Sequence, residues 1–215
     1  MSRKLVLVGG ASGSGKSTFV KYLKNKYNCD TYRRLDAFKD CAIKKGYNET
    51  NMFNYVSSEE ADSQFISFCV EHDCIVSDIH YALQRNKDFA SSEGESLYVA
   101  TLSDDLIKKL LDLEFDISAV LIQCDPEIVY FRMFDRFNKC GRRMRSKNIE
   151  EVIMQSTWER KMWEDLFLKF NIRSIELNSG LFTPEELVEQ FLIVDQTTKD
   201  RKKVLKLNNN KKNNK

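Results

Sequence analysis

The chain has 215 residues, of which 42% are hydrophobic and 31% are charged, and its formal net charge is +2. This composition excludes a collagen-like or largely disordered protein and suits a single α/β-sized domain. The charge is uneven: residues 199–215 contain eight Lys or Arg and one Asp, a net +7, so the rest of the chain carries −5 (2 − 7). A mildly acidic body gives no electrostatic reason for a nucleic-acid groove, and no DNA partner is expected.

The sequence predicts neither a secretory leader nor a membrane span. No apolar stretch approaches ~20 residues, and the first apolar run, Leu5–Val8, is too short for a signal peptide. The six cysteines form no C-x-x-C pair, and most lie in apolar runs. Buried free thiols in a reducing compartment are therefore the favoured interpretation. We expect a cytoplasmic protein with no membrane partner.

Strand-forming and helix-forming segments alternate along the chain. Two capping boxes, Ser57 with Glu60 and Thr183 with Glu186, mark helix starts. The pattern predicts strands at about 4–8, 29–32, 74–77, 118–123 and 173–177, with helices at about 18–27, after 57, 104–113, 126–138, 148–170 and 184–194. Such alternation predicts an α/β fold, a three-layer sandwich in which a five-stranded, mostly parallel sheet has helices on both faces.

The predicted domain spans residues 1–198, with an Arg-rich lid at about 139–147. The Lys/Asn-rich segment 199–215 cannot bury a core, so a disordered tail is expected there. Contact of this basic tail with RNA or another acidic partner is the less favoured alternative.

The most specific signal is a complete G-x-x-x-x-G-K-[ST] motif between the first strand and the first helix. Its glycines let successive backbone N–H groups surround an anion, and the helix start adds the positive end of a dipole. In such a loop the lysine reaches the β- and γ-phosphates, and the hydroxyl after it contacts Mg²⁺. The motif predicts a P-loop NTPase fold that binds ATP and Mg²⁺ through Gly10, Ala11, Ser12, Gly13, Ser14, Gly15, Lys16, Ser17 and Thr18.

Asp78 ends the buried strand at 74–77. Ligands bind at the carboxyl ends of strands in open α/β sheets, and phosphate-loop enzymes place a metal-organising Asp there. We therefore predict that Asp78 and Ser17 hold the magnesium ion, in preference to a helix-capping role for Asp78. His80 follows two residues later. It either orients a phosphate or water beside Asp78 or has a structural role, and both interpretations stay open.

Arginines gather in the second half of the chain. Arg132 lies on the predicted helix before the lid, Arg142 and Arg145 lie in the lid, and Arg160 lies on the helix after it. Phosphoryl transfer spreads negative charge over three equatorial oxygens, which guanidinium groups neutralise well. Taken alone, the 139–147 segment would be a solvated basic loop. Beside a complete phosphate loop, a closing lid is favoured.

Charged residues also follow the second strand. Arg33 or Arg34 would bind a phosphate of the acceptor, and Asp36 would bind an acceptor hydroxyl or take its proton. His80 and Arg160 are further candidates for binding the acceptor. A charged surface turn is an equally good interpretation of this segment.

These pieces together resemble the small P-loop nucleoside monophosphate kinases, most closely the archaeal-type adenylate kinases. The matching segments are the 10–18 loop, Val76-Ser77-Asp78-Ile79-His80, the Asp125-Pro126-Glu127 turn, and the 135–145 segment with the helix after it. The resemblance implies that Lys16 and Ser17 bind phosphates and Mg²⁺ and that Asp78 organises the metal. It also implies that Arg132, Arg142 and Arg145 neutralise the transferred phosphoryl group, with Arg160 nearby.

The chain departs from this family at the acceptor side. Where the family carries a glycine-containing segment after the second strand, this chain reads Arg33-Arg34-Leu35-Asp36. The sequence therefore predicts a kinase that transfers the γ-phosphoryl group of Mg·ATP to a small acceptor, with a nucleoside monophosphate as first choice. A kinase of another small metabolite, a kinase of a polynucleotide 5′-hydroxyl and an ATPase switch remain alternatives.

Overall fold

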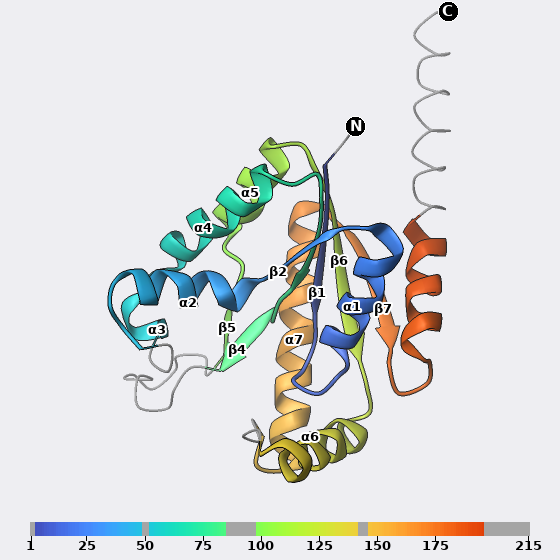
Figure 1. The fold of residues 1–215 in the computed structure, drawn as a ribbon. Coiled ribbons are helices and arrows are strands. Elements are labelled where there is room, and N and C mark those ends of the chain that lie inside the picture. The colour runs from blue at the N-terminus through green and yellow to red at the C-terminus, as the bar shows by residue number, and fades with distance from the viewer. Residues whose placement is uncertain (1–2, 49–51, 85–97, 142–145, 196–215) are drawn as a thin grey trace, which may run out of the picture.

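Residues 3–48, 52–84, 98–141 and 146–195 are described by the computed structural model of the chain (Figure 1). In chain order the elements are β1 Arg3–Gly9, α1 Lys16–Tyr27, β2 Asp30–Arg33, α2 Arg34–Lys44, α3 Met52–Tyr55, α4 Ser58–Val70, β3 Cys74–Asp78, β4 Ala82–Gln84, β5 Tyr98–Ala100, α5 Asp104–Asp112, β6 Phe115–Gln123, α6 Pro126–Cys140, α7 Ile149–Phe170 and β7 Arg173–Asn178. A last helix covers residues 184–195.

The central sheet has five strands in the order β2-β3-β1-β6-β7, and every neighbouring pair is parallel. This arrangement confirms the predicted α/β fold. Its register sets Val8 of β1 beside Asp78 of β3 and Gly9 beside Leu121 of β6. The phosphate loop therefore leaves the central strand with a strand end on each side, so its ligand lies at the middle of the carboxyl edge.

Alternate residues of the buried strands pack on opposite faces of the sheet. Leu5 and Leu7 of β1 join a core with α4, α5 and α7, whereas Val6 and Val8 join a second core with α1 and the last helix. Figure 1 shows these helices on the two faces. Both faces are covered because βα crossovers bring a helix back over the sheet, which explains the nearly unbroken apolar runs of the strands.

Some features differ from the sequence prediction. The segment after β2 is the helix α2, not a surface turn, because Ala37, Phe38 and Ala42 lie on one side of it and are buried against α4. Strand β6 begins three residues earlier than predicted, at Phe115. The antiparallel pair β4–β5 was not predicted, since strands of three residues are too short to show a period.

The prediction of free thiols is wrong for two of the cysteines. Cys29 and Cys74 form a disulfide, with their Cα atoms 5.0 Å apart, while Cys41, Cys69, Cys124 and Cys140 are free. The pairing arises because β2 and β3 are parallel neighbours that begin at the same level, so residues 45 apart in sequence meet. Sequence spacing alone does not reveal this adjacency.

Several predictions fall on residues outside the described ranges. The tail at 199–215 and the lid arginines Arg142 and Arg145 lie there. The lid is described only at its edges, where α6 ends at Cys140 and Asn148 caps α7 by accepting a hydrogen bond from the Glu151 N–H at 2.9 Å. The domain boundary at 198 also remains a prediction.

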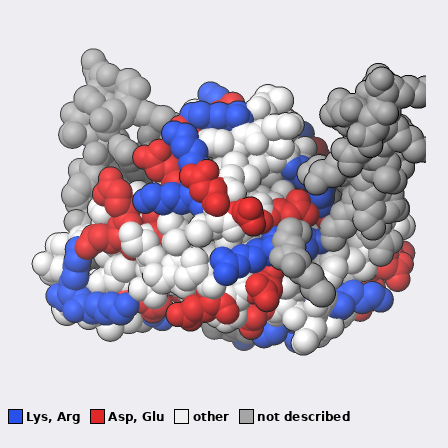
Figure 2. Space-filling view, turned by 90° about the horizontal axis from the view of Figure 1, so that it is seen from above, with Lys and Arg blue, Asp and Glu red and all other residues white. Residues whose placement is uncertain are grey.

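Figure 2 views the molecule from the end of the sheet where β1 begins. On this face the described Lys and Arg side chains are interspersed with Asp and Glu, so they form no continuous basic surface here.

Candidate active site

The phosphate loop runs from Gly10 to the first turn of α1. Gly10 has a φ of +139°, and a Cβ there would lie 2.3 Å from the carbonyl oxygen of Ile122. Gly15, with a φ of +97°, immediately precedes α1 and leaves its first N–H groups without a side-chain cap. The loop can therefore turn tightly over the end of β6 and present backbone donors to an anion.

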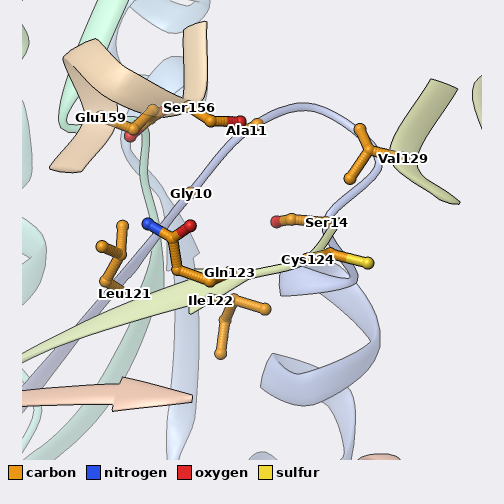
Figure 3. A pocket seen from close by; sticks show the side chains of 10 residues that line it. All are labelled: Gly10, Ala11, Ser14, Leu121, Ile122, Gln123, Cys124, Val129, Ser156 and Glu159. Atoms are coloured by element: carbon orange, nitrogen blue, oxygen red, sulfur yellow. The ribbon is translucent and has the colours of Figure 1, made fainter. Parts of the chain in front are cut away.

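Side chains of β6, α6 and α7 pack closely beneath the loop. Figure 3 shows it arching between Ser156 and Glu159 of α7 on one side and Val129 of α6 on the other, above the end of β6. The enclosed space is too small to hold a water molecule. A phosphate therefore has to bind on the open side of the loop, where the α1 dipole points.

Ser17 and Asp78 meet as the sequence predicts. The Ser17 hydroxyl donates a hydrogen bond of 2.7 Å to Oδ2 of Asp78. A hydroxyl and a carboxylate at this distance fit the two protein ligands that a P-loop magnesium ion takes, since phosphates and waters supply the others. Among the described residues, no group of three or more His, Cys, Asp or Glu forms an alternative metal site.

The amino group of Lys16 is buried inside the loop. It donates hydrogen bonds to the carbonyl oxygens of Gly10 at 2.6 Å and Ala11 at 3.0 Å. These bonds hold the cation at the centre of the cradle, from which a short movement of the side chain would bring it to a bound phosphate.

Glu159 connects the loop to the segment after β3. This carboxyl group is fully buried. Its Oε2 accepts a hydrogen bond of 2.7 Å from the Tyr81 N–H, and its Oε1 lies 2.7 Å from Nδ1 of His80. Burial raises the pKa of Glu159 to about 8, against the opposing effects of Lys16 and of the Gly10 N–H. Glu159 thus fixes the position of the His80 ring. This contact is compatible both with a structural role for His80 and with a role in orienting a phosphate or water.

Tyr81 explains a glycine outside the motif. A Cβ on Gly9 would lie 2.2 Å from the Tyr81 ring, and the Tyr81 hydroxyl donates to the carbonyl oxygens of Leu7 and Val120. The ring therefore crosses β1 directly below the loop and fixes the level at which the loop begins.

Arg132 lies beside the loop and forms its outer wall. Its guanidinium donates to the Ser179 hydroxyl at 3.2 Å and to the Ser179 carbonyl oxygen at 2.9 Å. The Ser179 hydroxyl in turn donates to the carbonyl oxygen of Ser14. A Cβ on Gly15 would lie 4.0 Å from Nη1 of Arg132. The structure therefore brings this predicted arginine to the phosphate cradle and holds it there through the turn after β7.

A cavity of about 680 Å³ opens beside the same arginine. Gly13, Gly15 and Thr18 form its inner end, Arg132 and Arg136 form one wall, and residues 179–184 form the other. Its volume lies within the range of small-ligand sites. It adjoins the loop on the α6 side.

The predicted acceptor-side residues are not all brought together. Arg33 is exposed and lies 3.9 Å from Asp36, while Arg34 is buried against Asp62. Arg160 pairs with Glu176 of β7, which is the opposite edge of the sheet from β2. Arg160 therefore does not share a site with Arg33, Arg34 and Asp36 in this structure.

Sequence reasoning missed Glu159 and Ser179. Glu159 falls on the buried stripe of α7 with Val152, Trp163 and Leu166, so a charged residue on an apolar helical stripe was the available signal. Ser179 carries no such signal, because its role depends on where the turn after β7 lies relative to the loop.

None of the helices described is long and apolar enough to cross a membrane.

Comparisons with known proteins agree with this geometry. A family model described as AAA domain (AAA_18) matches residues 6–155. No curated protein matches the chain. The shikimate kinase from Bacteroides thetaiotaomicron is 12% identical, with a TM-score of 0.54 over 91% of this chain and 99% of that chain. The shikimate kinase from Acinetobacter baumannii, in complex with shikimate, is 11% identical, with a TM-score of 0.54 over 93% and 96%.

A gluconokinase from Sinorhizobium meliloti 1021 also matches, at 12% identity and a TM-score of 0.49 over 92% of this chain and 95% of that chain. At these identities the likeness concerns the fold. The expected P-loop kinase-like fold is thereby confirmed, whereas the narrower resemblance to adenylate kinases is not specifically supported. The family match spans more than half of this chain and contains the complete phosphate loop. The chain therefore belongs to the AAA_18 family of AAA domains.

Proposed function

We propose that the protein is an ATP-dependent phosphotransferase that phosphorylates a hydroxyl group of a small molecule. The observation that carries this proposal is the contact between Ser17 and Asp78 at the mouth of a complete phosphate loop. A second support is the cavity beside Arg132, which has room for the nucleoside of ATP.

Each residue of the site has a defined task in this proposal. The loop N–H groups and Lys16 bind the β- and γ-phosphates, and Ser17 and Asp78 hold Mg²⁺, which neutralises the developing charge when bound. Arg132 stabilises the phosphates from the α6 side. Catalysis then consists mostly of positioning and charge stabilisation, and it requires no strong base.

In this proposal the acceptor binds on the Asp78 side of the loop. The shikimate kinases among the similar structures act on a small metabolite, which favours such an acceptor over the nucleoside monophosphate that the sequence suggested first. A nucleoside monophosphate, a polynucleotide 5′-hydroxyl and an ATPase switch become outcomes of the experiment below.

The test incubates the protein with Mg·ATP and a panel of small hydroxy acids, sugars, nucleosides, nucleoside monophosphates and 5′-hydroxyl oligonucleotides. ADP release and phosphorylated product are both measured. Product from one compound supports the kinase and names its acceptor. ADP release without product from any compound indicates either the ATPase switch or an acceptor outside the panel.

Lys16→Ala should lower kcat/KM by about 100-fold or more, because one preorganised donor to a developing charge is worth roughly that factor. Lys21→Ala is the matched control, since Lys21 is an exposed lysine on the same helix. Circular dichroism checks that both variants fold. Full activity in folded Lys16→Ala would contradict the proposal.

A further inference from the structure

The strands β1 and β3 separate close to the point where the predicted magnesium ligands meet. Val8 of β1 lies beside Asp78 of β3, and the pairing ends where the Ile79 N–H donates a hydrogen bond of 2.9 Å to the Val8 carbonyl oxygen. Beyond this bond β1 leads into the phosphate loop at Gly10, whereas the backbone after β3 continues toward β4. Ser17 belongs to the loop side and Asp78 to the β3 side. Their separation therefore depends on how the two diverging segments are held.

Glu159 of α7 contacts both segments just beyond this separation. Its Oε2 accepts a hydrogen bond of 2.7 Å from the Tyr81 N–H, and its Oε1 lies 2.7 Å from Nδ1 of His80. On the loop side the same carboxyl group accepts a hydrogen bond from the Gly10 N–H. Glu159 and Gly10 also line the same small enclosed space under the loop (Figure 3). One side chain thus bridges the loop and the segment after β3.

The backbone of Gly10 is held from two sides. Its N–H donates to Glu159, and its carbonyl oxygen accepts a hydrogen bond of 2.6 Å from Nζ of Lys16. A Cβ at this position would lie 2.3 Å from the carbonyl oxygen of Ile122, so the start of the loop is also closely packed against β6. The length of the Glu159 side chain therefore sets how far this part of the loop lies from the backbone of Tyr81.

A carboxyl group at this place costs free energy. Glu159 is fully buried and shares the buried stripe of α7 with Val152, Trp163 and Leu166. Replacing a buried ionisable group by an apolar residue of similar volume often leaves stability unchanged or raises it. What an apolar residue cannot supply is the set of hydrogen bonds to the two backbone segments.

We propose that Glu159 is a positioning residue for the magnesium ion, which holds Ser17 and Asp78 in register through its hydrogen bonds to the loop and to the segment after β3. The direct hydrogen bond between Ser17 and Asp78 has to give way when the ion takes both side chains as ligands. The alignment of the two segments then relies on contacts such as those of Glu159. The inference rests on the proposed kinase function and adds to it a residue that acts through the two segments.

The bridge depends on hydrogen-bond geometry more than on charge. Burial raises the pKa of Glu159 to about 8, against the opposing effects of Lys16 and of the backbone N–H groups. Near neutral pH the carboxyl group is therefore mostly protonated, with one acceptor oxygen and one donor. A glutamine amide also offers an acceptor oxygen and a donor. Glu159→Gln should accordingly preserve the bridge.

The experiment measures how much Mg²⁺ tightens nucleotide binding, and it needs no acceptor. Calorimetry gives the Kd for ADP in excess Mg²⁺ and in excess EDTA, and the ratio of the two values is the magnesium gain. Glu159→Leu removes the hydrogen bonds and should reduce the magnesium gain at least about tenfold, a factor that corresponds to the loss of one or two hydrogen bonds. Its Kd for metal-free ADP should stay nearly unchanged, because the loop N–H groups and Lys16 remain.

Three further variants complete the test. Glu159→Gln should keep a magnesium gain within about threefold of the wild type, because the amide restores the hydrogen bonds. Glu164→Leu is the matched control, since Glu164 is half-exposed on the same helix, and it should leave both Kd values unchanged. Glu159→Asp, whose carboxyl group is one methylene shorter, takes the place of Glu159→Leu if circular dichroism shows that the leucine variant does not fold. It should also lower the magnesium gain, because the carboxyl group no longer reaches both segments.

Three results would overturn the proposal. The first is a magnesium gain equal to that of the wild type in whichever folded variant, Glu159→Leu or Glu159→Asp, is measured. The second is a loss of metal-free affinity that accounts for the whole loss of Mg·ADP binding, because Glu159 would then support the loop only structurally. The third is a Glu159→Gln variant that loses as much of the gain as Glu159→Leu, because charge and not hydrogen-bond geometry would then be responsible.

The binding measurement is separate from the kinase assay. A magnesium gain that falls in Glu159→Leu and returns in Glu159→Gln supports the positioning role even when no compound of the panel is phosphorylated. An unchanged gain in a protein that phosphorylates an acceptor overturns the positioning role alone. A wild type without any magnesium gain contradicts the proposed magnesium site, and the positioning role with it.

Discussion

Glu159 is a buried carboxyl group that lies between the phosphate loop and the segment after β3. It contacts His80 and Tyr81 after β3, and its pKa responds to Lys16 and Gly10 of the loop. Buried carboxyl groups are retained at such positions because they satisfy backbone N–H groups that no other element reaches. One side chain from α7 thereby fixes the relative position of two segments of the sheet edge.

Its ionisation predicts a pH dependence of stability. The pKa of Glu159 is raised by burial from 4.5 to about 8, so the folded state binds this proton more tightly than the unfolded state does. The resulting stabilisation is complete below pH 4.5 and is lost as the pH rises through about 8. Relative to Glu159→Gln, the wild type should therefore lose free energy of unfolding between about pH 5 and 8.

Urea unfolding of both proteins at pH 5, 7 and 9 measures this difference. Glu164→Gln, a half-exposed position on the same helix, should give a curve parallel to that of the wild type. A parallel curve for Glu159→Gln as well would show that Glu159 does not change its proton binding on folding.

At the scale of elements, β2 is the least buried strand of the five-stranded sheet. Strand β2 is an edge strand of four residues with mostly exposed side chains. The Cys29–Cys74 disulfide ties its start to β3, while Tyr32 stacks on Phe68 of α4 at 4.5 Å. The disulfide thus holds β2, which carries Arg33 and leads into α2, beside β3.

Reduction of this disulfide should lower the free energy of unfolding by about 2–4 kcal/mol, because it releases a constraint on the unfolded chain. Guanidinium unfolding with and without reductant measures the loss. The Cys29→Ser/Cys74→Ser variant should not respond to reductant. Thiol titration of the denatured, unreduced protein should find the four free cysteines, and six free thiols would refute the pairing.

At the scale of the whole molecule, a buried charge cluster joins the two ends of the described chain. Asp195 at the end of the last helix is 1% exposed and pairs with Lys4 of β1 and Arg173 of β7. The Tyr27 hydroxyl donates to the same carboxylate at 3.1 Å. The cluster holds the last helix, and with it the turn that carries Ser179, against the sheet.

Asp195→Asn should lower the free energy of unfolding by about 3 kcal/mol or more, because two buried cations lose their shared carboxylate. Asp116→Asn is the control, since Asp116 also pairs with Arg173 but its side chain is 24% exposed, and its loss should be smaller. Urea unfolding measures both variants. An Asp195→Asn loss no larger than that of Asp116→Asn would argue against the cluster as an anchor.

The fold class and the position of the phosphate-loop motif could be read from local sequence patterns. Alternating apolar strands and helices predict a parallel sheet, and the spacing from Gly10 to Ser17 requires a strand before it and a helix after it. The position of Asp78 beside the loop was predictable in the same way, because the residue that ends a buried parallel strand lies at the carboxyl edge of the sheet. Its role as a metal ligand stays a prediction. These are local patterns, and short-range physics sets them.

Which residues far apart in the chain lie together depends on how the strands and helices pack in three dimensions. The strand order separates Arg160 from Arg34, pairs Cys29 with Cys74 and brings Glu159 below the loop. The packing of α2 also buries Arg34, and two of its nitrogen atoms have no hydrogen-bond partner. In the sequence Arg34 is only one of several neighbouring charged residues. Contacts between residues far apart in the chain depend on strand order and register, and no spacing within one segment specifies these.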